Sequence, residues 1–109
     1  MATDVRALLV TAPDGEVADS LARAVVGEGL AAGVNVVPGV VSIFRWQGEV
    51  MRDTEVLMVI KTTDGNVEPL RARVVELHPY EVPEVLVLTV DAGHEPYLDW
   101  VRGEAVPRS

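Results

Sequence analysis

One short segment of the chain brings together an imidazole, a phenol and two carboxylates: His78-Pro79-Tyr80-Glu81-Val82-Pro83-Glu84. Neutral imidazole is a good ligand for zinc and copper, and Glu81 or Glu84 could add carboxylate oxygens. The two prolines exclude a helix interior or a central strand, so the segment is predicted to be a stiff connector that holds polar side chains in place. We therefore expect part of any functional site to lie here, with His78, Glu81 and Glu84 as candidate metal ligands.

His78 also has an interpretation that involves no metal. A single histidine is too few for a closed transition-metal site, so ligation needs three copies of the chain to converge or a carboxylate from a neighbouring chain. Alternatively, His78 caps the end of the preceding helix and hydrogen-bonds a carboxylate. The sequence leaves both open. The other histidine, His94, falls in a predicted surface turn and is assigned no role.

Lys61 is a candidate anion-binding residue. It lies in Lys61-Thr62-Thr63, at the end of a predicted central strand. Strand ends often open onto a cleft, where a lysine ammonium can meet a phosphate or a carboxylate as a point charge. The alternative, which we prefer, is a salt bridge between Lys61 and Glu55 or Glu84.

Four further residues are candidates for a binding site or an inter-subunit cleft. Trp46 falls at the tip of a predicted hairpin, where an exposed indole is unusual, so we expect it to insert into a neighbouring subunit. Tyr80 is expected to pack as an aromatic close to that cleft. Asn35 and Ser42 lie near a bend predicted at Pro38-Gly39 and are expected to satisfy backbone groups there.

Apolar patterning predicts the elements that position these residues. A first helix is predicted over residues 16–28, with Asp14 as its N-cap and Gly29 as its C-terminal glycine. A second helix begins near residue 67, after Asp64-Gly65-Asn66, which can cap it, and ends at His78 because the next residue is proline. The remaining predictions are strands over 5–11, 34–46, 49–62 and 85–90, a short last helix with Tyr97, Trp100 and Val101 on one face, and a frayed tail over 107–109.

The order of these elements predicts an α+β fold, the ferredoxin-like βαββαβ pattern, with a long hairpin between its second and third strands and a short C-terminal helix. We expect the first and third strands to lie side by side and parallel, and the two main helices to cover one face of the sheet. The other face is also expected to carry apolar side chains, from Val36, Val41, Ile43 or their neighbours. A chain of this size has few elements left to cover them, so we expect a second subunit to do so.

Length and composition narrow the function classes. The 109 residues predict one domain over 1–109, and the net charge of −8 makes nucleic acid and anionic membranes poor partners. No apolar run is long enough to span a bilayer, the N-terminus lacks signal-peptide features, and cysteine is absent, so we expect a cytoplasmic protein. Enzyme signatures are also absent: Gly27, Gly29 and Gly33 are badly spaced for a phosphate loop, and no catalytic serine elbow or paired-histidine metalloprotease motif occurs. We therefore expect that this protein is not an enzyme.

Several segments, in the right order, resemble the CutA divalent-cation tolerance proteins over nearly the whole chain. The segment 78–84 matches that family's most distinctive motif. The other matching segments are Thr11-Ala12-Pro13-Asp14, Leu30-Ala31-Ala32-Gly33-Val34-Asn35, Ser42-Ile43-Phe44-Arg45-Trp46-Gln47-Gly48, Glu55 with Lys61-Thr62-Thr63, and Tyr97-Leu98-Asp99-Trp100.

The resemblance implies a ferredoxin-like fold, a tight and heat-resistant homotrimer built through the long hairpins, and an intracellular role in tolerance of divalent metals, copper among them. Two departures bear on the metal. Some family members carry cysteine where this chain has Val10 and Gly33, so a sulfur-containing copper site cannot be carried over. The three methionines form no obvious cluster, which disfavours Cu(I) and leaves Cu(II) or Zn(II) on imidazole and carboxylate.

Three functions remain open on the sequence. The first is a trimeric protein that binds and responds to divalent metal ions. The second is a small-molecule or anion sensor that resembles the PII signalling proteins and uses inter-subunit clefts, which is an analogy of fold alone. The third is a structural trimer that scaffolds or anchors partner proteins.

Overall fold

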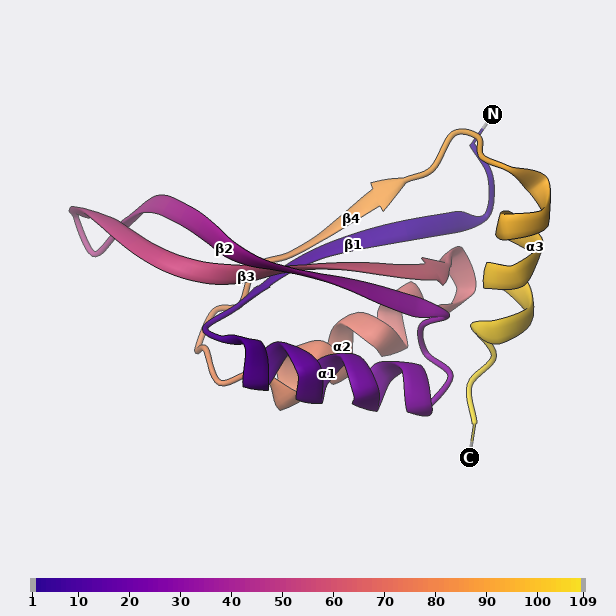
Figure 1. Ribbon diagram of the computed structural model, residues 1–109, viewed down its shortest axis with the longest axis horizontal. Coiled ribbons are helices and arrows are strands. Elements are labelled where there is room, and N and C mark those ends of the chain that lie inside the picture. Colours follow the sequence, from indigo (N-terminus) through magenta and orange to yellow (C-terminus); the bar gives the residue numbers. More distant parts are fainter. Residues whose placement is uncertain (1, 109) are drawn as a thin grey trace.

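In the computed structural model, which describes residues 2–108, two helices lie against one face of a four-stranded sheet and a third helix lies at its end (Figure 1). A two-stranded hairpin projects from the opposite end of the sheet. The α+β class and the βαββαβ order predicted from the sequence are confirmed. The elements are β1 (Val5–Ala12), α1 (Gly15–Gly27), β2 (Gly33–Trp46), β3 (Glu49–Thr63), the single-turn 3-10 helix η1 (Asp64–Asn66), α2 (Val67–Leu77), β4 (Val85–Thr89) and α3 (Glu95–Glu104).

The sheet has the strand order β2-β3-β1-β4, and all three neighbouring pairs are antiparallel. The first and third strands are adjacent as predicted, but the prediction that they are parallel is wrong. The helical crossover makes β1 parallel to β2, and β3 lies between them. Because the tight turn at Gln47-Gly48 forces β3 to run against β2, it also runs against β1.

Local sequence signals explain how α1 and β2 are bounded. The Asp14 carboxylate accepts a hydrogen bond from the Val17 amide at 2.9 Å and so caps α1. Gly29 follows the helix with φ +76°, a left-handed conformation that glycine adopts without strain. At Pro38-Gly39 the register between β2 and β3 shifts, which makes a bulge on an edge strand, as predicted.

Two clusters of buried apolar side chains form the core. The larger lies between the sheet and the two main helices, with Leu8, Met58, Ile60, Leu70 and Val74 fully buried. The smaller joins α3 to the end of the sheet through Val5, Ala32, Leu98, Val101 and Ala105. The apolar residues of α3 that face the core are therefore Leu98 and Val101, whereas Tyr97 and Trp100 are about half exposed, which corrects the predicted face of this helix.

Two predictions about segment ends are wrong. The tail predicted to be frayed over 107–109 is held at Arg108, because the Arg108 amide donates to the Glu28 carbonyl at 2.8 Å and Val106 lies against Gly29, while Ser109 lies outside the described residues. Asn66 does not cap α2 with its side chain. Its side-chain amide nitrogen instead donates to the Ala105 carbonyl, and its side-chain oxygen accepts no capping hydrogen bond from the first turn of α2.

The face of the sheet opposite α1 and α2 is uncovered within one chain. Cross-strand pairing places apolar side chains from all four strands there, namely Val37, Leu57, Val59, Ala7, Leu9, Leu86 and Leu88. Several of these, including Val37, Leu86 and Leu88, are strongly exposed. Over residues 2–108, no helix combines the length and apolarity needed to cross a membrane.

Candidate functional site

A groove of about 820 Å³ lies between the loop that follows α2 and the projecting hairpin of β2 and β3. One wall is the loop segment 79–84, and the other is one face of the hairpin. The groove therefore lies at the segment that the sequence singled out. Its lining residues outside the loop are Thr11, Ser42, Ile43, Phe44, Trp46, Met51, Asp53 and Glu55.

His78 anchors the loop from beneath the groove. The side chain is only 7% exposed, and both ring nitrogens are engaged: Nε2 lies 2.8 Å from the Thr11 carbonyl, and Nδ1 accepts from the Tyr80 amide at 3.1 Å. A carbonyl can only accept, so this pattern fits the neutral ring with its proton on Nε2. His78 does stand at the C-cap of α2, as the metal-free interpretation expected, but its partners are two backbone groups and not a carboxylate.

Tyr80 links the loop to the sheet through a side-chain hydrogen bond. Its hydroxyl donates to Glu55 Oε2 at 2.7 Å, and its ring lies 4.7 Å from the ring of His78. Burial, together with the Glu55 carboxylate, raises the pKa of the Tyr80 phenol well above its usual range, so the group stays a neutral donor. Glu55 itself is only 7% exposed, and its second oxygen has no hydrogen-bond partner among the described residues.

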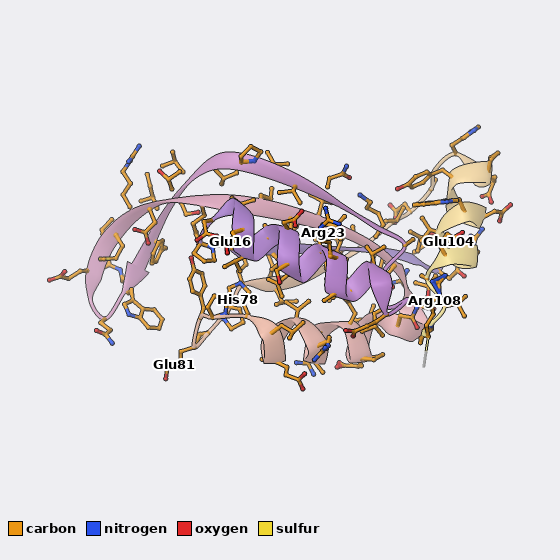
Figure 2. All side chains as sticks on the ribbon, turned by 60° about the horizontal axis from the view of Figure 1, so that its bottom comes forward. Glu16, Arg23, His78, Glu81, Glu104 and Arg108 are labelled. Carbon is orange, nitrogen blue, oxygen red and sulfur yellow. The ribbon has the colours of Figure 1, made fainter. Side chains whose placement is uncertain are left out.

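The predicted metal ligands are not brought together within one chain. Glu81 and Glu84 are exposed and line the groove, and Figure 2 shows the Glu81 side chain projecting outward from the loop, away from His78. Within residues 2–108, no group of three or more His, Cys, Asp or Glu side chains could hold a metal ion. Ligation by His78, Glu81 and Glu84 stays a prediction, and it requires the loop to rearrange or a second copy to contribute.

Lys61 lies away from the groove, on the open face of the sheet. Its ammonium donates to Asn35 Oδ1 and to the Val59 carbonyl at 3.3 Å, and it forms no ion pair within residues 2–108. The predicted salt bridge with Glu55 or Glu84 is wrong, because Glu55 is held by Tyr80 and Glu84 lines the groove. Partial burial lowers the pKa of Lys61.

The small polar residues near the bend act differently from expectation. Asn35 holds Lys61 and has no hydrogen bond to the backbone at Pro38 among the described residues. Ser42 pairs with Asp53 across the hairpin, and both line the groove. Trp46 stands at the hairpin tip, about half exposed, and borders the same groove, whereas its insertion into a neighbouring subunit stays a prediction.

The sequence interpretation missed the contribution of β3 to this site. The sequence patterns give Asp53 no role, and they name Glu55 as a possible partner for Lys61 and as part of the resemblance, not as a residue of this groove. The signal that could have found them is alternation along the strand: Met51, Asp53 and Glu55 occur at every second position and so share one face. What sequence did not show was that the loop after α2 lies against that face.

Known proteins match this chain closely in sequence. A family model described as "CutA1 divalent ion tolerance protein" matches residues 6–104. The chain is 52% identical over 95 residues to "Divalent-cation tolerance protein CutA" of Thermus thermophilus, covering 87% of this chain and 92% of that protein. It is 50% identical to human "Protein CutA", covering 90% of this chain and 55% of that protein, so it spans about half the length of the human relative. It is also 44% identical to "Protein CutA, chloroplastic" of Arabidopsis thaliana, covering 85% of this chain and 51% of that protein.

Solved structures match it equally well. The "Divalent cation tolerance protein (Cut A1)" of Thermus thermophilus superposes with a TM-score of 0.89 at 49% identity, covering 92% of this chain and 97% of that chain. A structure described as the periplasmic divalent cation tolerance protein CutA of Archaeoglobus fulgidus superposes with a TM-score of 0.90 at 29% identity, covering 94% and 99%.

Proposed function

This chain belongs to the CutA1 divalent ion tolerance protein family, and we propose that it is a homotrimer that binds and responds to divalent metal ions, copper first among them, without catalysing a reaction. The observation that carries the proposal is the match over residues 6–104, together with 52% identity to a relative named for divalent-cation tolerance. Relatives are named as chloroplastic and periplasmic, and we propose the cytoplasm for this chain on its composition.

The charge and chemistry of the groove support a cation as the ligand. Four carboxylates line it, those of Asp53, Glu55, Glu81 and Glu84, and no lysine, arginine or histidine does. Imidazole from His78 with carboxylate oxygens suits Cu(II) or Zn(II), and without cysteine a Cu(I) thiolate site is excluded. Ligation by His78 requires its Nδ1 to release the Tyr80 amide, so metal binding would be coupled to movement of the loop.

The uncovered sheet face supports assembly. It presents apolar side chains from all four strands, and the hairpin beyond the bulge adds Ile43 and Val50, which are 69% and 67% exposed. Apolar surface of this extent is removed from water when copies associate. A trimer also offers the convergence of three chains that a site with one histidine per chain needs.

Calorimetric titration of CuCl₂ and ZnCl₂ into the wild-type protein at neutral pH tests the metal function. We expect saturable binding of at least one of the two ions, weakening as the solution is brought to about pH 5, where a free imidazole is protonated. Titration of Mg²⁺ is the matched control, because that ion prefers oxygen ligands and retains its waters. Heats no larger for Cu(II) and Zn(II) than for Mg²⁺ would contradict the proposal.

Lys61 favours a second candidate function, an anion sensor of the PII type. Its ammonium is partly buried and has no carboxylate partner among the described residues. Its positive charge is therefore available to pair with a bound anion. Titration of nucleotides and of inorganic phosphate against wild type and Lys61→Met separates the two functions: the sensor requires binding that the substitution abolishes. A scaffold for partner proteins is a third candidate function. It becomes the favoured one if the protein binds neither divalent metal ions nor anions.

A further inference from the structure

Lys61 is the only lysine of the chain, and it stands beside apolar neighbours on the open face of the sheet. Strand pairing places Ala7 next to it, and Val59 lies two residues away on the same face. Its ammonium donates to Asn35 Oδ1 and to the Val59 carbonyl. No carboxylate of residues 2–108 forms an ion pair with it, so within one chain its charge is met by neutral groups alone.

The Asn35 side chain offers further hydrogen-bond donors beside this ammonium. Its Oδ1 accepts from Lys61, so the Nδ2 group of the same amide carries two N–H donors, which have no acceptor among residues 2–108. An ammonium and an amide N–H side by side match the two oxygens of one carboxylate. A single positive charge, in a chain with a net charge of −8, also suits a monovalent anion better than a divalent phosphate.

Two exposed aromatic rings of α3 lie beside this position, where β2 begins and β3 ends (Figure 1). Trp100 and Tyr97 are 45% and 43% exposed, and their ring centroids are 5.5 Å apart. The six-membered ring of the Trp100 indole lies 3.3 Å from the position that a Cβ would take at Gly33. Gly33 pairs with Lys61 across the strands, so the indole and the lysine share one face of the sheet. Asn35 lies two residues further along β2, about 7 Å from Gly33.

We propose that this corner of the sheet binds a small aromatic carboxylate, with the carboxylate on Lys61 and Asn35 and the aromatic ring against Trp100. The inference rests on the anion-sensing function proposed for Lys61 and names the class of anion. The spacing of about 7 Å along β2 leaves room for one ring between the polar donors and the indole. Contact with the indole favours an aromatic ligand, because an inorganic anion has no apolar surface to bury there.

NMR spectroscopy of the ¹⁵N-labelled wild-type protein, in its native assembly, tests the proposal, because the two tryptophan indole N–H groups give separate signals. The probe is phenylacetate. We expect it to shift the Trp100 signal saturably and to leave the Trp46 signal unchanged. Acetate lacks the ring and 2-phenylethanol lacks the charge, so each should bind about tenfold more weakly or worse.

Two substitutions separate the charge of Lys61 from charge in general. Lys61→Met removes the ammonium and keeps an apolar stem, and we expect it to weaken phenylacetate binding by about tenfold or more. Arg71→Met is the matched control, because it removes one positive charge from an exposed site on α2 and should leave binding unchanged.

A second measurement needs no variant. Because Lys61 is the only lysine, the rate at which an amine-selective reagent acylates its side chain can be followed by mass spectrometry of the wild-type protein. We expect saturating phenylacetate to slow this acylation severalfold and 2-phenylethanol to leave it unchanged.

The outcomes separate this inference from the anion-sensing function. Phenylacetate that shifts Trp46 in place of Trp100, binds Lys61→Met as well as wild type, or leaves acylation of Lys61 unslowed overturns the proposal. Binding of inorganic phosphate or nucleotides that depends on Lys61, without binding of phenylacetate, overturns the aromatic carboxylate while the anion sensor stands. If no anion binds, both are overturned.

Discussion

His78 and Tyr80 show how single residues fix the loop that borders the groove. The imidazole spans from the Thr11 carbonyl to the Tyr80 amide, and the Tyr80 hydroxyl reaches Glu55 on β3. The loop is therefore tied to two strands by side chains of its own. A metal ion that recruited His78 would compete directly with one of these ties.

Replacing Tyr80 by Phe should remove the hydrogen bond to Glu55 and leave a nearly buried carboxylate without a donor. We expect the free energy of unfolding to fall by about 1.5–3 kcal/mol, the range for hydrogen bonds to charged groups. Chemical denaturation measures it, with Tyr97→Phe as the matched control, because Tyr97 is half exposed, its hydroxyl has no hydrogen-bond partner among residues 2–108, and its loss should cost about nothing. Equal losses in the two variants would show that the Tyr80–Glu55 contact is not stabilising.

The candidate site was predictable from sequence only in part. The prolines and polar groups of 78–84 located the loop and placed His78 at the end of α2. The partner of Tyr80 was not predictable, because Glu55 lies 25 positions away and meets it only through the docking of α2 on the sheet. Lys61 was misassigned for the same reason: its acceptor, Asn35, lies close to it only through pairing of two strands.

At the scale of elements, the C-terminal tail is held against the end of α1. A Cβ at Gly29 would lie 1.9 Å from the Val106 carbonyl oxygen, and the backbone there is left-handed. We expect Gly29→Ala to cost at least about 1–2 kcal/mol from the left-handed conformation alone. Gly27→Ala is the control: nothing lies within 4 Å of its Cβ position, and alanine favours a helix, so stability should hold or rise by about 0.5–1 kcal/mol. Thermal or chemical unfolding distinguishes them, and a neutral Gly29→Ala would contradict the packing of the tail.

A second contact at this end joins α1 to α2. Arg73 donates to both carboxylate oxygens of Glu28, each at 2.9 Å, and this pairing lowers the pKa of Glu28 below its ordinary value of 4.5. A lowered pKa contributes stability above the ordinary value, and that contribution is lost as the pH falls through the value in the fold. Wild type should therefore exceed Glu28→Gln in stability at pH 7, and the difference should shrink below about pH 4.5. A difference independent of pH between 7 and 3 would refute the ionic origin.

The helices and strands themselves were easier to predict from sequence than their packing against one another. The cap at Asp14, the bulge at Pro38-Gly39 and the end of α2 before Pro79 follow from local chemistry, and the structure confirms them. The direction of β1 against β3 and the docking of the tail depend on contacts between distant segments. Those contacts overrode the local expectations, as in the hydrogen bond that Asn66 makes to Ala105.

At the scale of the whole molecule, the two tryptophans offer a matched comparison. Each is 45% exposed in a single chain, but Trp46 stands at the hairpin tip whereas Trp100 stacks on Tyr97 and packs over Gly33. We expect Trp46→Ala to weaken assembly by about 2–4 kcal/mol, as for a central aromatic of an interface, with little effect on the fold of each chain. Trp100→Ala should instead loosen α3 within its own chain. Sedimentation measures assembly and circular dichroism measures unfolding. Identical effects of the two variants in both measurements would contradict this placement.

Assembly should also make heat resistance depend on concentration. Association stabilises the folded chains by mass action, so the melting temperature should rise as the protein concentration is increased from about 1 to 100 µM, and it should exceed the usual mesophilic range of about 45–65 °C. Differential scanning calorimetry across that series is the measurement. A midpoint that is both ordinary and independent of concentration would count against a trimer.

Native mass spectrometry of the wild-type protein with Cu(II) added at neutral pH tests the central claim most directly, because it reads assembly and metal content together. The account predicts the mass of three chains with copper ions retained, and a His78→Ala variant that stays trimeric without retaining copper. A monomeric wild type, or equal copper retention by wild type and His78→Ala, would contradict it.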